Sequence, residues 1–311
     1  MRQNYPLDLK VEMAKRRIAS FVDYYGEEGV YVGFSGGKDS LVVLNIARKM
    51  YPNLKAVYND TWLEYPQIRQ FVHSFKNVEF IKPQMSMKDI VKTYGWCFPS
   101  KDVAEAIWYA RKGSQWAINK LCGLDNQGKE SFFRQQYKKW LPLYESDIKI
   151  SSFCCIKQKE EPVAYYEEVT GRKPILGLLA EESLRRKEAY IRTGCISFYS
   201  KRPMAKPISF FTENDILQYI WEEKLPYGSP YGKIAECGMC EGQCCLVADA
   251  KPQKFRTTGE KRTGCMFCPV GMHLDRGAKL KRLRMYDPRL YDYCMEELGE
   301  KELVEWVMKH Y

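Results

Sequence analysis

The sequence lacks any apolar run of about 18 residues, the length that a helix needs to cross a bilayer. Its first residues, MRQNYPLDLKVEMAKRRIASF, contain no apolar stretch of the kind that marks a secretory signal peptide. Internal repeats and low-complexity tracts are also absent from the 311 residues, of which 45% are hydrophobic. These absences argue against a membrane protein and against a largely disordered one. We therefore expect a cytoplasmic, globular protein of one or two domains.

Histidine is scarce and cysteine is plentiful. Only 3 His accompany 12 Cys, so a His-dominated metal site is not expected. In a reducing compartment, cysteines are expected to be metal ligands or redox-active thiols rather than to form disulfides. The 49 Lys and Arg outnumber the 39 Asp and Glu, which gives a net charge of +10. This balance favours anionic partners such as nucleotides, RNA or DNA, although an ordinary enzyme with a basic surface has the same balance.

Short apolar runs alternate with helical segments along the chain. Buried strands are predicted at 30–34, 55–60, 78–82 and 174–180. A lead-in helix within 1–29 and a helix at 41–50 complete an alternation that is typical of an α/β fold with a doubly wound parallel sheet. Thr212 and Asp215 have the spacing of a helix capping box.

The chain is divided into four predicted regions. A nucleotide-binding α/β domain is expected over 1–95 and 151–226, and a helical insertion over 96–150. A Cys-rich metal-binding region follows over 227–277, with irregular structure expected over 227–264, and then a helical tail over 278–311.

The hexapeptide SGGKDS carries the strongest chemical signal. It covers Ser35–Ser40, between the first predicted strand and its helix. Gly36 and Gly37 allow close approach of an anion to the backbone, and the free N–H groups of a helix start favour a phosphate there. Lys38 adds a positive charge, Ser40 adds a donor, and Asp39 suggests a Mg²⁺ contact or a role in ordering the loop. The pattern is not the Walker loop, because GxxxxGK[ST] is absent.

With its preceding strand, SGGKDS resembles the PP-loop of the ATP pyrophosphatases, the adenine nucleotide α-hydrolase-like proteins. GLLAEESLRR, at 177–186, resembles the GxRxxESxxR segment of one branch, the phosphoadenosine phosphosulfate (PAPS) reductase family. Glu182, Ser183 and Arg186 match it, whereas Leu179 stands where that family usually has Arg. The segment 206–231 resembles a further motif of the same branch.

The resemblance implies a Rossmann-like nucleotide fold. The end of the second predicted strand adds three candidates, because a doubly wound sheet binds ligands at the carboxyl ends of its strands. The predicted nucleotide-binding residues are Ser35, Gly36, Gly37, Lys38, Asp39, Ser40, Asn59, Asp60, Thr61, Glu182, Ser183 and Arg186.

Two cysteine pairs form a second signal. Cys154 and Cys155 are adjacent, and Cys265 and Cys268 form a CxxC motif later in the chain. This set resembles the [4Fe–4S] ligands of APS reductases and of DNA-phosphorothioation proteins in the same branch, and such a cluster needs four thiolates. Zinc held by the two pairs, or purely structural thiols, are the alternatives.

A third cysteine group lies between these pairs, in ECGMCEGQCC. Its members are Cys237, Cys240, Cys244 and Cys245. They could hold Zn²⁺ or another second metal, replace Cys154 and Cys155 at the cluster, or carry sulfur as a persulfide. The other cysteines, Cys97, Cys122, Cys195 and Cys294, are expected to be packing residues.

Aromatic and basic residues interleave over 96–150. Such a segment can stack bases and hold phosphates, or it can be an amphipathic helical subdomain with a solvated charged face, which we favour. A basic stretch over 251–262 precedes Cys265, and it could hold an anionic substrate or simply be exposed.

The resemblance to the ATP pyrophosphatases implies an enzyme that binds ATP and Mg²⁺ and adenylates a substrate with release of pyrophosphate. Lys38 and Asp39 are its expected catalytic residues, and a [4Fe–4S] cluster is expected to support sulfur transfer. The candidate partners are RNA, DNA or a small-molecule sulfur acceptor, a sulfur-donor protein and a second copy of the chain. No membrane partner is expected.

Two other functions stay open at this point. The first is reduction of APS or PAPS to sulfite, with Cys237 as the nucleophile. In the reductases that the chain resembles, the nucleophilic Cys lies in a C-terminal ECGLH-like motif, and the loop is usually a degenerate form of SGGKDS. Here the loop is complete and the sequence ends KELVEWVMKHY, so both features argue against reduction. The second is a non-catalytic module that binds nucleotides or nucleic acid, because a fold alone does not establish an activity.

Overall fold

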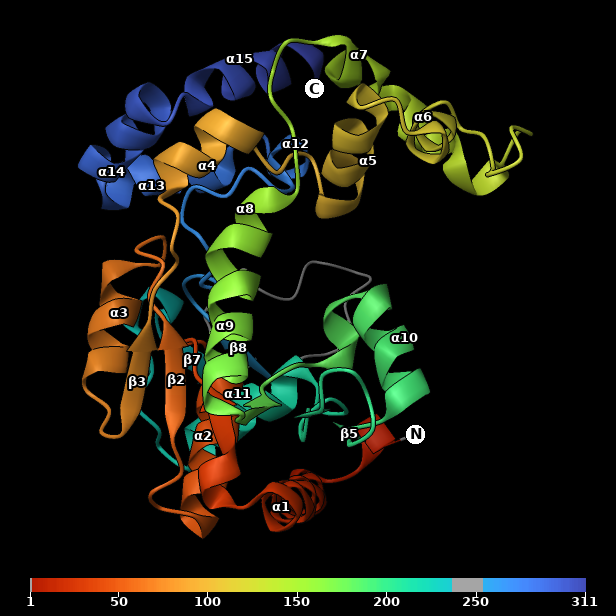
Figure 1. The fold of residues 1–311 in the computed structure, drawn as a ribbon. Helices are drawn as coiled ribbons and strands as arrows, with labels where there is room; N and C mark the ends of the chain where they lie inside the picture. The colour runs from red at the N-terminus through yellow and green to blue at the C-terminus, as the bar shows by residue number, and fades with distance from the viewer. Residues whose placement is uncertain (1, 237–253) are drawn as a thin grey trace. The chain divides into compact units, whose positions relative to one another are not determined.

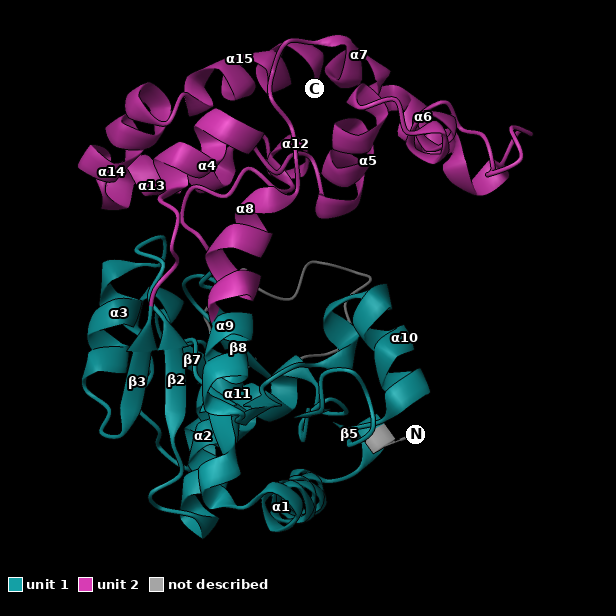
Figure 2. Ribbon diagram, in the orientation of Figure 1, with its two compact units in different colours: residues 1–81, 163–264 teal, residues 82–162, 265–311 magenta. Residues whose placement is uncertain are grey.

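A computed structural model describes residues 2–236 and 254–311 (Figure 1). The chain forms two compact units, which Figure 2 colours separately. Unit 1 comprises residues 1–81 and 163–264, and unit 2 comprises residues 82–162 and 265–311. The PP-loop candidate therefore belongs to unit 1, whereas both cysteine pairs belong to unit 2.

Unit 1 is built on a six-stranded sheet. Its strand order is β3-β2-β1-β4-β6-β5, and the pairs are parallel except for β5, which runs antiparallel to β6. The strands are β1 (Val30–Gly33), β2 (Ala56–Asn59), β3 (Val78–Ile81), β4 (Lys173–Leu176), β5 (Ile196–Ser197) and β6 (Met204–Ala205). Four of these strands lie where the apolar runs predicted them.

Helices cover both faces of this sheet. Val30 and Val32 of β1 belong to the main core, together with residues of α1 (Leu7–Tyr25), α2 (Lys38–Met50) and α11 (Glu213–Glu222). Tyr31 points to the other face, where its ring meets that of Tyr166 on α9 (Glu161–Thr170) at 5.2 Å. The alternation of side chains along β1 thus confirms the predicted α/β fold with a doubly wound, mostly parallel sheet.

The remaining elements of unit 1 are short. They are η1 (Arg2–Asn4), η2 (Glu27–Gly29), α3 (Pro66–His73), η5 (Ala180–Glu182), α10 (Leu184–Thr193), η6 (Ser229–Tyr231), β7 (Ile234–Glu236) and β8 (Phe255–Thr257). β7 and β8 pair as a small antiparallel sheet. The prediction of irregular structure over the whole of 227–264 is therefore wrong at these two strands, where Ile234 and Phe255 are buried in the core.

A capping box and a buried ion pair fix the start of α11. Thr212 and Asp215 form the predicted capping box, because the side chain of each accepts a hydrogen bond from the backbone N–H of the other. Asp215 also forms a buried ion pair with Lys10 of α1, at 2.6 Å between Nζ and Oδ2. This pair joins the first helix of the chain to a helix about 200 residues later.

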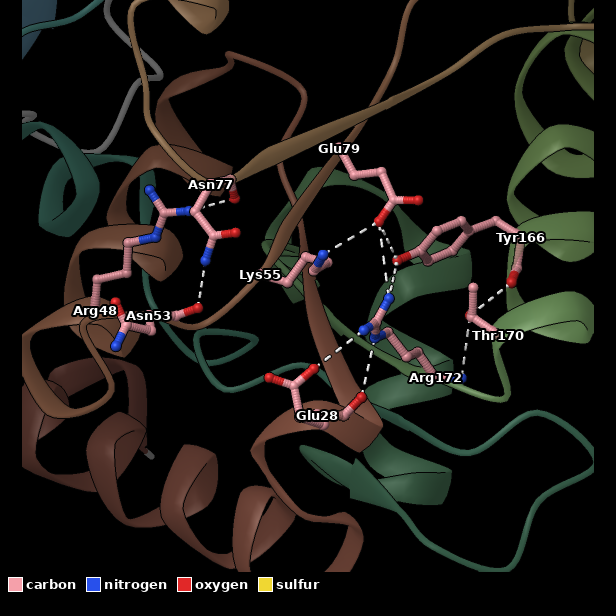
Figure 3. Close-up of polar contacts among 9 residues, drawn as sticks. All are labelled: Glu28, Arg48, Asn53, Lys55, Asn77, Glu79, Tyr166, Thr170 and Arg172. Atoms are coloured by element: carbon pink, nitrogen blue, oxygen red, sulfur yellow. Dashed lines mark hydrogen bonds and ion pairs between the residues drawn. The ribbon is translucent and has the colours of Figure 1, made fainter.

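A polar network joins the strands at their amino ends (Figure 3). Arg172, just before β4, donates to the carbonyl oxygen and the carboxylate of Glu28, which precedes β1. The same guanidinium donates to Tyr166, whose hydroxyl donates to Glu79 of β3 at 3.1 Å. Lys55, before β2, forms an ion pair with Glu79 at 3.6 Å. These contacts support the edge of the sheet opposite to the PP-loop candidate.

Unit 2 is largely helical. Its elements are α4 (Met87–Tyr94), α5 (Lys101–Arg111), α6 (Gln115–Leu121), η3 (Phe132–Trp140), α7 (Leu141–Glu145), α8 (Phe153–Cys155), η4 (Ile156–Glu160), α12 (Met272–Asp275), α13 (Ala278–Tyr286), α14 (Pro288–Asp292), η7 (Tyr293–Glu297) and α15 (Glu300–His310). A parallel bridge pairs Trp96 with Ile150. No helix in the described ranges has both the length and the apolar character required to span a membrane.

Glu300, the first residue of α15, is fully buried, and neither carboxylate oxygen has a hydrogen-bond partner within the described structure. Burial raises its pKa well above 4.5, and the charge of Lys279 offsets this only in part. The folded protein therefore keeps a proton that the unfolded chain releases, and stability falls as the pH rises from about 4.5 toward the folded pKa.

Replacing Glu300 with Gln is expected to remove this pH-dependent loss. The stability of the variant relative to the unchanged protein should therefore be greater at pH 8 than at pH 4. Thermal unfolding at both pH values measures this. An equal difference in Tm at pH 4 and pH 8 would contradict a carboxyl group that titrates on unfolding.

Candidate functional site

The SGGKDS loop lies where the strand order of the sheet reverses. β1 lies between β2 and β4 in the sheet. From β2 the chain adds β3 on one side, and from β4 it adds β6 and β5 on the other side. In open α/β sheets such a switch point creates the crevice in which ligands bind, at the carboxyl ends of the strands. The loop joins the carboxyl end of β1 to the N-terminus of α2, whose free N–H groups favour an anion.

Gly36 has a structural reason to be glycine. Its φ is +71°, and an added Cβ would lie 2.7 Å from methyl carbons of Ile68 and Val72 on α3. Ser35 and Ser40 brace the same turn, since Ser40 Oγ donates to the carbonyl of Gly37 and accepts from the backbone N–H of Ser35. The loop is therefore held in one conformation by its own side chains and by α3.

Lys38 is the buried cation of the loop, with only 5% of its surface exposed. Its ammonium group donates to the carbonyl oxygen of Lys261 at 2.8 Å and pairs with Glu213 Oε1 at 3.1 Å. Its backbone N–H donates to Tyr231 Oη, which also shares a hydrogen bond with Thr263. Three segments far apart in the sequence thus fix one positive charge at the start of α2.

A cavity of about 260 Å³ opens beside Lys38. It is lined by Lys38, Asp39, Leu179, Glu181, Glu182, Glu213 and Arg262. Asp39 Oδ1 is buried there and accepts no hydrogen bond from any described residue. Burial raises the pKa of Asp39, and the charge of Lys38 lowers it in part. The lining thus presents two cations and four carboxyl groups to whatever occupies the cavity.

The segment after β4 forms the other wall. Glu182 forms ion pairs with Arg186, on α10, and with Arg262 at 3.3 Å. Burial lowers the pKa of Arg186, and the nearby charge of Arg262 lowers it further. Ser183 caps α10, since its hydroxyl accepts from the backbone N–H of Arg186. Arg262 is a residue of this wall that the nucleotide-site prediction did not include.

Gly177 allows this wall to approach the loop. An added Cβ would lie 2.8 Å from backbone atoms of Asp39 and Ser40, which cannot yield as a side chain can. Replacing Gly177 with Ala is therefore expected to displace the first turn of α2 and to weaken nucleotide binding at least tenfold, as isothermal titration would measure. Gly29→Ala is the matched control, because its Cβ would meet only Tyr25 Cβ at 3.4 Å. Equal affinities for the two variants would contradict the close approach.

The residues predicted at the end of β2 are already engaged with one another. Asp60 accepts two hydrogen bonds from Arg69, at 2.8 and 2.9 Å, and Thr61 donates to Glu64. Burial is the largest single influence and raises the pKa of Asp60, but the hydrogen bonds and charge of Arg69 and the backbone N–H of Trp62 together outweigh it, so the net pKa is lowered. Asn59 ends β2 and is half-buried. These residues stay candidates for contacts with a nucleotide.

The cysteine pairs occupy one region of unit 2. Cys154 and Cys155 end α8, while Cys265 and Cys268 precede α12. The pKa of Cys268 is raised mainly by burial and also by the nearby charges of Cys265 and Cys155. No group of three or more His, Cys, Asp or Glu side chains within residues 2–236 and 254–311 is arranged to hold a metal ion.

Cys97 joins this region, although it was expected to be an isolated packing residue. Its thiol lies close enough to those of Cys154 and Cys155 to interact with them electrostatically. The neighbouring thiols of Cys154 and Cys97 lower the pKa of Cys155, burial raises it, and the positive charges of Lys101 and Lys159 lower it further. The sequence carried no signal for this contact, because Cys97 lies more than 50 residues from its partners.

The third cysteine group lies outside the described residues. Cys237, Cys240, Cys244 and Cys245 fall within 237–253, so their predicted roles as second-metal ligands, and that of Cys237 as a nucleophile, stay predictions. Among the described residues of unit 1, Cys195 is the one cysteine, and it is buried in the core.

Some aromatic and basic side chains of 96–150 contact one another, while others are exposed. Lys112 lies over the ring of Trp108 at 4.3 Å, and Lys120 pairs with Asp102 at 2.6 Å. Phe132 and Phe133 have most of their surface exposed, and Tyr109 and Trp116 about two fifths of theirs. The choice between a base-stacking segment and an amphipathic subdomain stays a prediction.

Comparison with known families identifies a phosphoadenosine phosphosulfate reductase domain over residues 29–270. The chain belongs to that family. The domain is one of the PP-loop, adenine nucleotide α-hydrolase-like proteins, so the predicted superfamily and branch are both confirmed.

Among solved structures, a PAPS reductase from Candida auris in a phosphate complex is similar to this PAPS reductase-family protein. It shares 16% sequence identity, with a TM-score of 0.40, and the match covers 70% of this chain and 82% of that chain. None of the curated proteins that were compared matches the sequence.

Proposed function

We propose that this member of the PAPS reductase family binds Mg·ATP at the SGGKDS loop and cleaves it between the α- and β-phosphates while adenylating an acceptor. The observation that carries the proposal is Lys38, a buried cation at the N-terminus of α2 that lines a cavity shared with Arg262. Backbone N–H groups, the helix dipole and two cations together suit a polyphosphate.

The reaction follows from these positions. An oxygen of the acceptor attacks the α-phosphorus, the bond from that phosphorus to the α,β-bridging oxygen breaks, and pyrophosphate leaves with the bonding electrons. Lys38 and Arg262 stabilise the charge that develops on the phosphate oxygens. The adenylated oxygen then leaves as AMP, with its bonding electrons, when hydrosulfide attacks the carbon that bears it and forms the new carbon–sulfur bond.

Mg²⁺ suits the acidic part of the cavity. Asp39 Oδ1 is a buried oxygen without a described partner, and Glu182 and Glu213 line the same space. Carboxylate oxygens are the protein ligands that Mg²⁺ prefers, together with phosphate oxygens of a substrate. When bound, the ion neutralises charge on the leaving pyrophosphate. Asp39 would hold it, which explains why a carboxyl group stands in a loop that binds anions.

The proposal also includes a [4Fe–4S] cluster on the cysteines of unit 2, which the side chains of the described residues do not arrange as a metal site. Cys154, Cys155, Cys265 and Cys268 supply four thiols, which is the number that such a cluster requires. The charges of Lys101, Lys159 and Lys279 act on these thiols and would balance the negative charge of a thiolate-bound cluster. When bound, the cluster supplies electron transfer or an iron at which sulfur can be held.

The decisive experiment is pyrophosphate exchange. Purified protein, ATP and labelled pyrophosphate should give labelled ATP once an acceptor is present, and nucleotide titration on the same anaerobic preparation should favour Mg·ATP over APS and PAPS. A preference for APS or PAPS with release of sulfite would overturn adenylation. That outcome would instead support the sulfonucleotide reduction that the name of the family suggests.

Anaerobically purified protein is expected to be brown, with absorbance near 400 nm. Cys265→Ser should remove most of the iron and the colour, because a hydroxyl group is a poor substitute for a thiolate ligand. Cys294→Ser is the control, since Cys294 is a buried cysteine of the same unit that is not one of the predicted ligands. Full iron content in Cys265→Ser would contradict its role as a ligand, and a colourless preparation that contains only zinc would contradict the cluster.

A further inference from the structure

We propose that the indole of Trp62 is the surface on which the base of the bound nucleotide stacks. This inference rests on the proposed nucleotide site at the SGGKDS loop and deepens it, because it assigns recognition of the base to a residue that the sequence did not single out. Trp62 lies in the turn between β2 and α3, at the carboxyl end of a strand that pairs with β1. The turn and the loop both belong to unit 1.

Trp62 is an exposed residue in a turn that is otherwise buried. Its exposed fraction is 64%, whereas Asp60, Thr61, Leu63 and Glu64 are each 8% exposed or less. The turn therefore buries two carboxyl groups and leaves its largest apolar side chain in water, which is the reverse of what the hydrophobic effect favours. An exposed ring in such a setting is expected to have a ligand.

The backbone of Trp62 lies in the left-handed region, with a φ of +61°. Glycine adopts this conformation freely, whereas a bulky side chain adopts it at a cost in free energy. A smaller residue would therefore suit the turn better, so the requirements of folding do not explain a tryptophan here. Residues held in such conformations are concentrated at ligand-binding sites.

Arg69 of α3 holds one face of the indole. The central carbon of its guanidinium lies 3.6 Å from the centroid of the Trp62 ring. Two hydrogen bonds from the same guanidinium to Asp60, at 2.8 and 2.9 Å, fix its position. A cation over an aromatic ring is attracted to the π-electrons of that ring. The indole is therefore held in one orientation, and the surface that Arg69 does not cover is open to a second flat group.

α3 connects this ring to the loop that would bind the phosphates. Arg69 follows Ile68 on α3, and methyl carbons of Ile68 and Val72 lie 2.7 Å from the position of an added Cβ on Gly36. The helix that orients Trp62 thus also packs against the SGGKDS loop. Since β1 and β2 are parallel neighbours, the loop and the turn lie at the same edge of the sheet.

A nucleobase is the flat group that fits this surface. Stacking of a base on an aromatic side chain is favourable and tolerates differences among bases, because every base has a π-face. Trp62 is therefore expected to strengthen the binding of a nucleotide relative to a polyphosphate that has no base. Lys38 and the backbone of the loop bind the phosphates in either ligand.

The test is isothermal titration with the Mg²⁺ complexes of ATP and of inorganic tripolyphosphate. Trp62→Gly should weaken the binding of ATP by roughly tenfold or more and leave the affinity for tripolyphosphate unchanged. Trp62→Phe keeps an aromatic face, so its ATP affinity should lie between those of Trp62→Gly and the unchanged protein. Trp221→Ala is the control, because Trp221 on α11 is another half-exposed indole of unit 1, and it should leave both affinities unchanged.

The two ligands separate stacking from a structural role. If Trp62 only supported the turn, its loss would disturb α3 and the loop at Gly36, and both ligands would bind less tightly by the same factor. That result, or an unchanged ATP affinity in Trp62→Gly, would overturn the inference.

Failure of the proposed function gives a different result. A preference of the unchanged protein for APS or PAPS over ATP would overturn adenylation. A weaker affinity of Trp62→Gly for the preferred nucleotide, with unchanged affinity for tripolyphosphate, would still support stacking on Trp62. Failure of the unchanged protein to bind any of these nucleotides would overturn the nucleotide site and this inference together.

Discussion

Replacing Lys38 with Ala is expected to lower kcat/KM for ATP in pyrophosphate exchange by roughly 10²–10³-fold. Removal of one charge-stabilising donor from a site that excludes water has an effect of about this size. Lys38 is buried, charged and held at the N-terminus of α2, so no water-exposed lysine can replace it. Isothermal titration with Mg·ATP would show the accompanying loss of affinity.

Lys49→Ala is the matched control for this prediction. Lys49 lies in the last turn of the same helix and forms an exposed ion pair with Glu223, so the substitution removes the same charge from the opposite end of α2. Its exchange rate and ATP affinity should stay close to those of the unchanged protein. Equal losses in both variants would mean that net charge, rather than the position of Lys38, governs binding.

Replacing Lys10 with Met is expected to cost about 3–5 kcal/mol of stability, because it leaves the buried carboxylate of Asp215 without its counter-ion. The Lys10 side chain is 2% exposed and that of Asp215 is 10% exposed, so water cannot take over the lost interaction. The loss should be measured by urea unfolding followed by circular dichroism, and we expect α11, which begins beside this pair, to lose order with it.

Two further variants make the result specific to the buried pair. Lys15→Met, on the same helix, breaks an exposed pair with Glu12 and should change stability by less than about 1 kcal/mol. Lys10→Met combined with Asp215→Asn removes both charges and keeps an oxygen for the cap of α11. The double variant should be less destabilised than the sum of its single substitutions. Additive losses would rule out a direct interaction between the two residues.

Much of unit 1 could be predicted from local sequence. The strands β1, β2, β3 and β4 are short apolar runs with polar boundaries, and their positions follow from side-chain burial alone. The capping box at Thr212 was predictable for a similar reason, because all of its bonds lie within four residues. The loop after β1 was found because its glycines and charges are contiguous.

Residues brought together by distant segments could not be predicted in this way. Arg262 reaches the wall formed by Glu182 from about 80 residues away, and the bridge of Trp96 with Ile150 joins segments more than 50 residues apart. Such contacts depend on tertiary packing, which leaves no periodicity in the sequence. The hairpin of β7 and β8 was missed because its strands are only three residues long and flank a Cys- and Gly-rich stretch.

The contacts of Lys38 have a consequence for which ligands the cavity admits. Its ammonium group is already satisfied by Glu213 and by the carbonyl of Lys261, so an incoming molecule must replace these interactions before it gains one of its own. An uncharged nucleoside has no anionic group to replace the carboxylate of Glu213 at the ammonium group of Lys38, whereas a phosphate chain does. For the proposed nucleotide site, we therefore expect the ion pair of Lys38 and Glu213 to favour charged ligands over uncharged ones.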